Sequence, residues 1–335
     1  MPKKSFQTYR LYFQTPLHIG DVRPEDYGNS ESFIRSDTLI AAVTAMLGKT
    51  GKIEDNFDGQ FPFRVSSLFP FTTIEKELCY FFPKLSKRMP VVTVKDQPLE
   101  YTKKLKKLKW LDQFYFEAQL NEKEFEQFGN EKQEDIQGEF CSQVKLPKDG
   151  FITRQVSQRV TIPRDRAGGE DPAPFYMERL LFREGSGLYF LVEGSDFAAL
   201  EDALNLLQHE GLGTDRTIGN GAFTWEKGTI DLELPESDIC TNLSLFCPEG
   251  QDQLRNMLSD DASYDTVKRG GWITTEGFQT YRKKGVYMFT EGSVFHGDAA
   301  PKGRKAIDVT PDASFIQLPH KIYRCGESIF LPVKL

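Results

Sequence analysis

Four glycines and one arginine lie within the stretch GLGTDRTIGNGAF at positions 211–223. Glycine permits positive φ angles and leaves backbone N–H groups open to a close ligand, so such a loop can cradle an anion. Arg216 adds a fork of N–H donors that matches a phosphate. The glycines concerned are Gly211, Gly213, Gly219 and Gly221. Their spacing fits neither the P-loop nor the dinucleotide-binding pattern, which argues against a mononucleotide cofactor.

The same residues also suit a purely structural turn. A glycine often ends a helix, and a β-bulge often begins the strand that follows. In that role Asp215 and Arg216 would pair with each other and brace the turn. The residue types alone leave both the anion-binding role and the structural role open.

The elements on both sides of the loop must position it. Asp196–His209 repeats apolar residues at helical spacing, and Ala222–Lys227 is typical of a strand. The loop therefore follows a helix and enters a strand, which is the reverse of the order at a phosphate-binding P-loop.

The N-terminal part predicts a strand, a helix and then two strands, which is the opening of a ferredoxin-like fold. The helix is expected to have its N-cap at Ser36–Asp37 and to end at Gly48. Strands are predicted at Phe6–Gln14, Arg64–Phe71, Leu78–Phe82, Phe151–Ile162, Tyr176–Arg183 and Gly187–Glu193.

We therefore predict an α+β protein with two ferredoxin-like (RRM-type) domains. The first covers residues 1–150 and carries an irregular insertion at about 84–140, and the second covers 151–335 and carries the glycine-rich loop. Within the insertion, apolar residues from Tyr101 to Leu111 fall at helical spacing, with lysines off that stripe. This predicts a short helix with a basic face.

Charge is distributed unevenly along the chain. The formal net charge is −7, yet Lys84–Lys109 holds nine Lys or Arg against two acids, and Glu117–Glu139 holds eight acids against two lysines. Such segregation suits a protein that meets a polyanion on one surface, although a run of charge is also typical of a solvated helix face.

The composition argues against several classes of protein. Five scattered cysteines without CxxC spacing argue against a disulfide scaffold and a structural zinc site, and we expect no metal or other cofactor. The sequence shows neither an apolar run long enough to span a bilayer nor a secretory signal, so we expect a cytoplasmic protein without membrane contact.

The helix followed by GLGTDRTIGNGAF resembles the signature glycine loop of the RAMP superfamily of CRISPR proteins. More narrowly, it is similar to the loop of the subunit that caps the crRNA 5′ end in type III-A (Csm) complexes. Further segments agree with this family in the same order: Pro16–Gly20, Ser66–Pro70, Tyr80–Lys84, Arg159–Arg166, Arg282–Lys284 and Met288–Ser293. Leu85 stands where the family usually has proline, and Pro163 interrupts the match of its own segment.

This resemblance implies two RRM-type domains with a cleft that holds the 5′ repeat-derived handle of a crRNA. It implies a non-catalytic subunit that also contacts the large polymerase-like Csm subunit and the Csm backbone RAMP subunit. Loop amides, nearby arginines and the helix end at Ser36 would meet phosphates. The predicted RNA-binding residues are His18, Gly20, Arg35, Ser36, Arg159, Arg164, Arg166, Gly211, Gly213, Thr214, Asp215, Arg216, Gly219, Gly221, Lys283 and Lys284.

Two alternative functions stay open. A metal-independent endoribonuclease that processes CRISPR repeat RNA would use His18 as its general base, but the sequence offers no obvious second acid–base partner, so we assign no catalytic residue. His18 could equally be a turn histidine whose hydrogen bonds are satisfied. A non-CRISPR RNA-binding module would use the same loop without the other Csm subunits.

Overall fold

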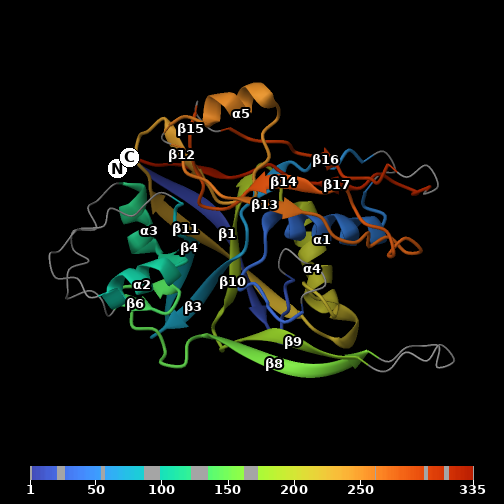
Figure 1. Cartoon of the computed structure of the whole chain (residues 1–335), viewed down its shortest axis with the longest axis horizontal. Helices are drawn as coiled ribbons and strands as arrows, with labels where there is room; N and C mark the ends of the chain where they lie inside the picture. Colours follow the sequence, from blue (N-terminus) through green and yellow to red (C-terminus); the bar gives the residue numbers. More distant parts are fainter. Residues whose placement is uncertain are drawn as a thin grey trace.

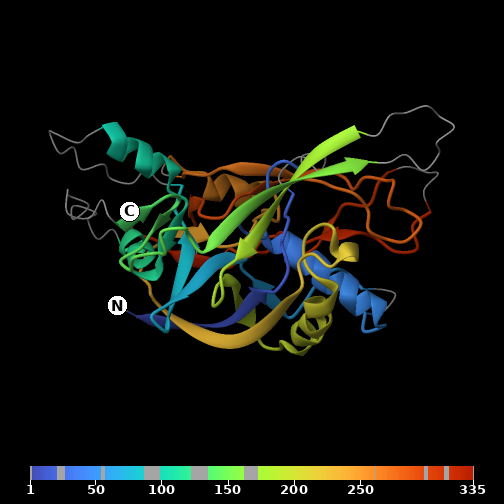
Figure 2. The same cartoon turned by 90° about the horizontal axis from the view of Figure 1, so that it is seen from below.

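A large β-sheet runs through the middle of the computed structural model (Figures 1 and 2). The structure describes residues 2–20, 27–53, 57–86, 99–121, 135–161, 173–260, 262–297, 301–312 and 317–334. The strand order is β11–β1–β10–β3–β4–β5–β7–β6, and β2 also pairs with β10. These strands are β1 (Lys3–Phe13), β2 (Phe63–Val65), β3 (Phe69–Ile74), β4 (Glu77–Pro83), β5 (Trp110–Asp112), β6 (Ile136–Gln137), β7 (Phe140–Cys141), β10 (Gly187–Gly194) and β11 (Phe223–Glu233).

The remaining strands form smaller sheets, and a few helices complete the fold. The pairs β8–β9, β13–β14 and β16–β17 are two-stranded, and β15–β12–β18 is three-stranded. Their bounds are β8 (Ile152–Thr161), β9 (Ala173–Phe182), β12 (Ile239–Asn242), β13 (Thr266–Arg269), β14 (Val286–Phe289), β15 (Val294–His296), β16 (Ile307–Asp308), β17 (Tyr323–Arg324) and β18 (Phe330–Pro332). The helices are α1 (Ser36–Lys49), α2 (Leu99–Lys107), α3 (Gln113–Leu120), α4 (Ala198–Glu210), α5 (Gln251–Met257) and the short 3-10 helix η4 (Arg216–Ile218).

Both faces of the large sheet are buried, and β1 shows why its sequence is rich in aromatic residues. Tyr9 and Leu11 pack in an apolar cluster with α1 and α4, whereas Phe6 packs in a second cluster. Side chains alternate across a strand, so these two clusters lie on opposite faces. The second cluster also holds Trp110 of the insertion and Leu331 of the C-terminal region. The sheet is therefore the middle one of three layers.

The α+β class that the sequence predicts is confirmed. The predicted strands at 6–14, 78–82, 151–162, 176–183 and 187–193 correspond to β1, β4, β8, β9 and β10, and the helix at 196–209 corresponds to α4. The division into domains at residue 150 stays a prediction. The large sheet draws strands from both sides of that position, because β1 lies between β10 and β11.

Three local predictions are wrong. Arg35, not Ser36, is the N-cap residue of α1, and the Ser36 hydroxyl instead accepts a hydrogen bond from the Leu245 N–H at 3.0 Å. The helix of the insertion ends at Lys107, and Leu111 lies in β5, where it pairs with β4. The strand predicted at 64–71 is divided into β2 and β3. In each case a tertiary contact overrides the local pattern.

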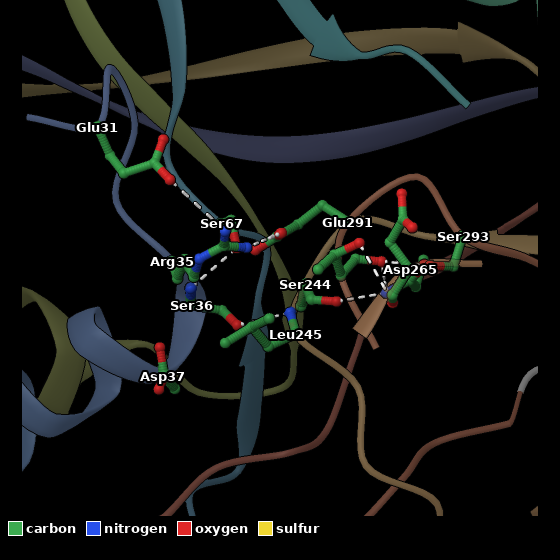
Figure 3. A network of polar contacts seen from close by, with 12 residues as sticks. Glu31, Arg35, Ser36, Asp37, Ser67, Ser244, Leu245, Asp265, Glu291 and Ser293 are labelled. Carbon is green, nitrogen blue, oxygen red and sulfur yellow. Dashed lines mark hydrogen bonds and ion pairs between the residues drawn. The ribbon is translucent and has the colours of Figure 1, made fainter. Parts of the chain in front are cut away.

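A buried ion cluster ties the start of α1 to the C-terminal region. Figure 3 shows Asp37 at this end of the helix. Its side chain is fully buried, and its carboxylate accepts hydrogen bonds from Arg269 at 3.0 and 3.1 Å and pairs with Arg324. Arg324 also donates to the Gly270 carbonyl at 2.8 Å. Burial lowers the pKa of the Arg324 guanidinium to about 10, so Asp37 compensates a charge that water scarcely reaches.

Removing the charge of Asp37 should leave two guanidiniums poorly compensated in the interior. We expect Asp37→Asn to lower the free energy of unfolding by about 3 kcal/mol or more, measured by urea denaturation. The matched control is Asp252→Asn, because Asp252 is almost fully exposed on α5 and lies 3.8 Å from Arg255. The control should change stability by less than about 0.5 kcal/mol. An Asp37→Asn loss no larger than that of the control would contradict the role of the cluster.

Candidate functional site

The segment that follows β1 is hydrogen-bonded to the glycine-rich loop along the main chain. The Gly221 N–H donates to the Pro16 carbonyl at 2.9 Å, and the Thr214 N–H donates to the His18 carbonyl at 3.0 Å. The Ala222 N–H donates to the Thr15 hydroxyl at 2.9 Å. The loop joins α4 to β11, and β11 pairs with β1. The segment after β1 therefore holds in place the loop that leads into the strand beside β1.

Close backbone approach explains three of the four glycines, since a Cβ on Gly211 would lie 2.4 Å from the Asn220 carbonyl oxygen. A Cβ on Gly213 would lie 2.4 Å from the His18 carbonyl oxygen, and a Cβ on Gly221 would lie 1.9 Å from the Leu212 carbonyl oxygen. Both residues have positive φ, at 86° and 76°. Gly219 also has positive φ, but a Cβ there would meet nothing within 4 Å. Gly211, Gly213 and Gly221 are therefore required by packing, whereas Gly219 is required by backbone conformation alone.

Most amides of the loop are already hydrogen-bonded inside the protein. Those of Gly211, Leu212, Thr214, Ile218, Gly219, Asn220 and Gly221 all donate to main-chain carbonyls. Among the described residues, the amides of Gly213, Asp215, Arg216 and Thr217 have no acceptor. The amides that could meet an anion are thus fewer than the sequence predicts, and they cluster at the turn that opens η4.

The turn at Asp215 is held by an ion pair with the neighbouring β8–β9 ribbon. Asp215 adopts a left-handed conformation, with φ at 59°, and its carboxylate pairs with the Arg159 guanidinium of β8. Arg216 is exposed and forms no ion pair within the described part of the chain. The purely structural alternative expected Asp215 to pair with Arg216, but Asp215 pairs with Arg159 instead, and Arg216 is exposed to solvent. Ile218 projects beside it, with 61% of its surface exposed.

The ribbon and the loop enclose a cleft of about 340 Å³, which is within the range of small-ligand pockets (roughly 300–1,000 Å³). Tyr27 and Phe175 provide its aromatic wall, with ring centroids 5.5 Å apart. Arg159 and Asp215 provide its polar side. The complete lining is Tyr27, Arg159, Ala173, Pro174, Phe175, Met177 and Asp215. Such a cleft offers an apolar surface for a flat ring, with a cation at its edge.

Sequence reasoning missed the aromatic wall. Phe175 lies on β9 and Tyr27 lies in an irregular segment far from it in the chain. The Tyr27 carbonyl accepts a hydrogen bond from the Glu178 N–H at 2.9 Å. The one feature of the sequence that could have indicated this wall is an aromatic residue, Tyr27, within a segment rich in turn-forming residues. No sequence pattern indicates that this residue faces Phe175.

The β8–β9 ribbon reaches away from the body of the protein, as Figures 1 and 2 both show. Segment 16–20 anchors it, because Leu17 and Leu180 exchange hydrogen bonds of 2.9 and 2.7 Å. Val156, Val160 and Tyr176 are exposed on the ribbon. The surface beside the cleft is therefore partly apolar, and it is formed by the two-stranded β8–β9 ribbon.

His18 is buried beneath the cleft, with only 1% of its surface exposed. Its Nδ1 lies 2.6 Å from the Glu178 carbonyl oxygen, which can only accept, so Nδ1 carries the proton. Its ring lies 6.0 Å from that of Tyr27. His18 thus supports the cleft wall with its ring and the loop with its carbonyl. Gly20 forms a β-bridge with Ser30 nearby.

Other predicted residues lie in a separate polar network (Figure 3). Arg35 pairs with Glu291 at 2.7 Å, and the Glu291 carboxylate also accepts from the Ser67 hydroxyl. The Ser36 N–H donates to the Ser67 hydroxyl at 2.9 Å. This network joins α1, the β2–β3 connection and the C-terminal region. The polar groups of Arg35 and Ser36 are therefore bound to partners inside the protein.

The remaining predicted residues are placed as follows. Lys283 and Lys284 lie in the loop just before β14, and Lys284 pairs with Asp312 at 2.5 Å. Burial and the nearby Arg269 charge lower the pKa of Lys283. Arg164 and Arg166 lie outside the described residues. The structure thus brings together His18, Gly20, Arg159 and the residues of the glycine-rich loop, but not Arg35, Ser36, Lys283 or Lys284.

Among the described residues, no group of three or more His, Cys, Asp and Glu side chains is arranged to hold a metal ion. None of the described helices has both the length and the apolar character needed to cross a membrane.

Comparison with known proteins gives consistent matches over the whole chain. Residues 236–333 match the family model of the CRISPR Csm4 C-terminal domain. The protein "CRISPR system Cms protein Csm4" of Thermococcus onnurineus (strain NA1) is 28% identical over 316 residues, which cover 90% of this chain and 92% of that protein. This chain is thus similar to Csm4 proteins over most of its length, and its C-terminal part matches the Csm4 family model. The resemblance to a RAMP-superfamily subunit of the type III-A Csm complex is therefore confirmed.

Solved structures agree in fold. One chain of a Csm1–Csm4 cassette in complex with cA4 aligns with a TM-score of 0.59 at 20% identity, covering 99% of both chains. One chain of the Csm3–Csm4 subcomplex of the type III-A CRISPR-Cas interference complex aligns with a TM-score of 0.58 at 18% identity, covering 98% of this chain and all of that one. The described fold is thus similar to that of the aligned chain in each of these two assemblies.

The two kinds of glycine in the loop should respond differently to alanine. Gly219→Ala places a side chain in open space, so it should cost only about 1–2 kcal/mol of left-handed strain. Gly221→Ala adds a collision with the Leu212 carbonyl to the same strain and should destabilise clearly more. Urea denaturation of both variants tests this expectation. Equal losses would show that backbone conformation alone, and not close packing, requires glycine at 221.

Proposed function

We propose that this chain is the subunit of a type III-A CRISPR effector complex that binds and caps the 5′ handle of the crRNA. The observation that carries the proposal is the cleft between the β8–β9 ribbon and the glycine-rich loop. It has an aromatic wall, made by Tyr27 and Phe175, and its lining residue Asp215 is followed directly by the exposed Arg216 and by open amides at the turn. Single-stranded RNA is held by this combination of stacking surface and phosphate donors.

In this role each part of the cleft acts on a different part of a nucleotide. A base of the handle stacks against the Tyr27–Phe175 wall, and its phosphate meets the Arg216 guanidinium and the amides of residues 215–217. Arg159 is less available for a phosphate, because it already pairs with Asp215. Its task is to hold the loop against the ribbon. The exposed Ile218 and Val160 offer further apolar contacts for neighbouring bases.

The proposed partners follow from the relatives. Solved assemblies contain Csm4 with Csm1 and Csm4 with Csm3. We therefore assign to this chain a link between the large polymerase-like subunit and the backbone RAMP subunits, with no catalytic step of its own. A strand order of β11–β1–β10–β3, with α1 and α4 in the connections, also supports a ferredoxin-like unit interrupted by β4–β9. A second such unit in the C-terminal region remains part of the proposal.

The rival endoribonuclease requires a general base that reaches the RNA. His18 is the candidate for that base, yet its ring is buried and its Nδ1 proton is directed to the Glu178 carbonyl. A base must lie within hydrogen-bond reach of the 2′-hydroxyl that it deprotonates. The burial of His18 therefore favours the non-catalytic role over the rival.

Arg216→Ala tests the loop assignment. Loss of one charge-assisted phosphate contact should weaken binding of a labelled handle RNA by about 1–3 kcal/mol, which is roughly 5- to 150-fold in Kd. Fluorescence anisotropy at one fixed salt concentration measures the change. Arg255→Ala on α5 is the matched control, since Arg255 is also an exposed arginine and should leave Kd within about twofold. Full handle affinity in Arg216→Ala would count against the loop.

Incubation of the purified chain with labelled CRISPR repeat RNA tests the absence of catalysis. We expect intact RNA in the presence of a chelator, because the buried His18 cannot act as a base. His18→Gln should bind the handle less well if the cleft wall relaxes, without any change in cleavage. Specific, metal-independent cleavage that His18→Gln abolishes would establish the endoribonuclease instead.

A further inference from the structure

A second two-stranded ribbon, in the C-terminal region, carries two large exposed aromatic side chains. β13 pairs with β14, and Lys268 lies directly opposite Tyr287. The ribbon continues past Gly270 and Gly271 to an isolated bridge between Trp272 and Arg282. Residues directly opposite each other in an antiparallel pair project on the same face. Each of these two exposed aromatic residues, Trp272 and Tyr287, therefore has a basic residue as its cross-strand neighbour.

Strand alternation forces these side chains outward. Val267, Met288 and Ile273 are buried in one apolar cluster, and their chain neighbours Lys268, Tyr287 and Trp272 therefore point away from it. Tyr287 is 67% exposed and Trp272 is 43% exposed. The two rings thus form part of the outer face of the ribbon, while its inner face is anchored in the core.

Each ring is accompanied by a cation. The Arg282 Cζ lies 4.5 Å from the Trp272 ring centroid, and the Lys268 Nζ lies 6.0 Å from the Tyr287 ring centroid. Both distances are within cation–π range, about 6 Å. These contacts hold the rings in defined positions although neither ring is buried, and they place positive charge beside each one.

The surrounding charge is positive in a chain that is negative as a whole. Residues 264–288 contain five basic and two acidic residues, against a formal net charge of −7 for the chain. Two of these cations have acidic partners elsewhere, since Arg269 pairs with Asp37 and Lys284 pairs with Asp312. Lys283 lies between Arg282 and Lys284, and its pKa is lowered by burial and by the Arg269 charge.

Aromatic rings interleaved with lysine and arginine fit single-stranded RNA better than a protein surface. Unpaired bases stack on exposed aromatic rings whatever their sequence, and the adjacent cations meet the phosphates between them. Protein interfaces also use Trp, Tyr and Arg, but lysine is depleted from them. We propose that Trp272 and Tyr287 form a stacking platform for unpaired bases of RNA, with Lys268 and Arg282 as phosphate contacts.

This platform is distinct from the glycine-loop cleft. In Figure 1, β13 and β14 lie above α1, whereas the β8–β9 ribbon lies along the lower edge of the molecule. The inference rests on the proposed function in one respect, which is that the chain binds RNA. It goes beyond that function by adding a second, sequence-tolerant surface for single-stranded RNA.

The full-length chain allows a direct optical test, because stacking on a base quenches tryptophan emission. Trp110 is buried and Trp225 is partly buried, so Trp272 is the most exposed of the three tryptophans. Titration with a 12-nucleotide oligo(A) RNA should quench the emission of Trp272, and the Trp272→Phe variant should lose the quenching but keep its affinity. A blunt A·U duplex of the same length should not quench, because its bases are already paired.

Affinity provides the second readout. Joint Trp272→Ala and Tyr287→Ala substitution should weaken oligo(A) binding at least about fivefold, as expected for the loss of stacked bases. Phe114→Ala, which removes an exposed aromatic ring from α3, should not change oligo(A) binding. Absence of quenching in the unmodified chain, or an unchanged affinity of the double variant, would overturn the proposal. Quenching by an acidic peptide instead of RNA would overturn it in favour of a protein partner.

These outcomes separate the platform from the handle site. If Arg216→Ala retains handle affinity while oligo(A) still quenches Trp272, the handle assignment fails and the platform stands. If Arg216→Ala loses handle affinity while the double variant binds oligo(A) like the unmodified chain, the platform fails and the handle assignment stands.

Discussion

The main-chain contact between the segment after β1 and its two neighbours is the constraint on which the candidate site depends. Residues 16–18 bind the glycine-rich loop through the Pro16 and His18 carbonyls, and they bind the β8–β9 ribbon through Leu17. One short segment thus sets the positions of both walls of the cleft. Because Gly213 and Gly221 pass within van der Waals contact of backbone, no other residue type fits there without displacing the loop.

Because of this contact, different parts of the loop have different roles. Its glycines and most of its amides are occupied in holding the loop against the β-sheet, and the turn at residues 215–217 is left to face outward. The structural and anion-binding roles of the glycines are therefore not alternatives, because rigid anchoring of the loop is what presents Arg216 and the open amides in a fixed place. The buried Asp37–Arg269–Arg324 cluster does the same on a larger scale, since it fixes the C-terminal region to the start of α1.

Local patterns predicted the elements better than they predicted the site. Amphipathic spacing is sufficient for α4, and alternation is sufficient for β8 to β10, because burial of one face dominates there. Ser36 shows the limit, since its hydroxyl is used by the Leu245 amide, whose position depends on the whole fold. His18 has the residue type of an RNA contact but the environment of a core residue. The Tyr27–Phe175 wall was missed because only tertiary structure brings an irregular segment and a distant strand together.

Crosslinking of a crRNA within the assembled effector complex tests the central claim most directly. The handle nucleotides would carry a photoreactive base, and the crosslinked peptides of this chain would be identified by mass spectrometry. We expect the adducts to lie on Tyr27, on Phe175 and within the loop at 211–221. Adducts confined to other surfaces, with the cleft unmodified, would contradict the claim that this cleft holds the end of the guide.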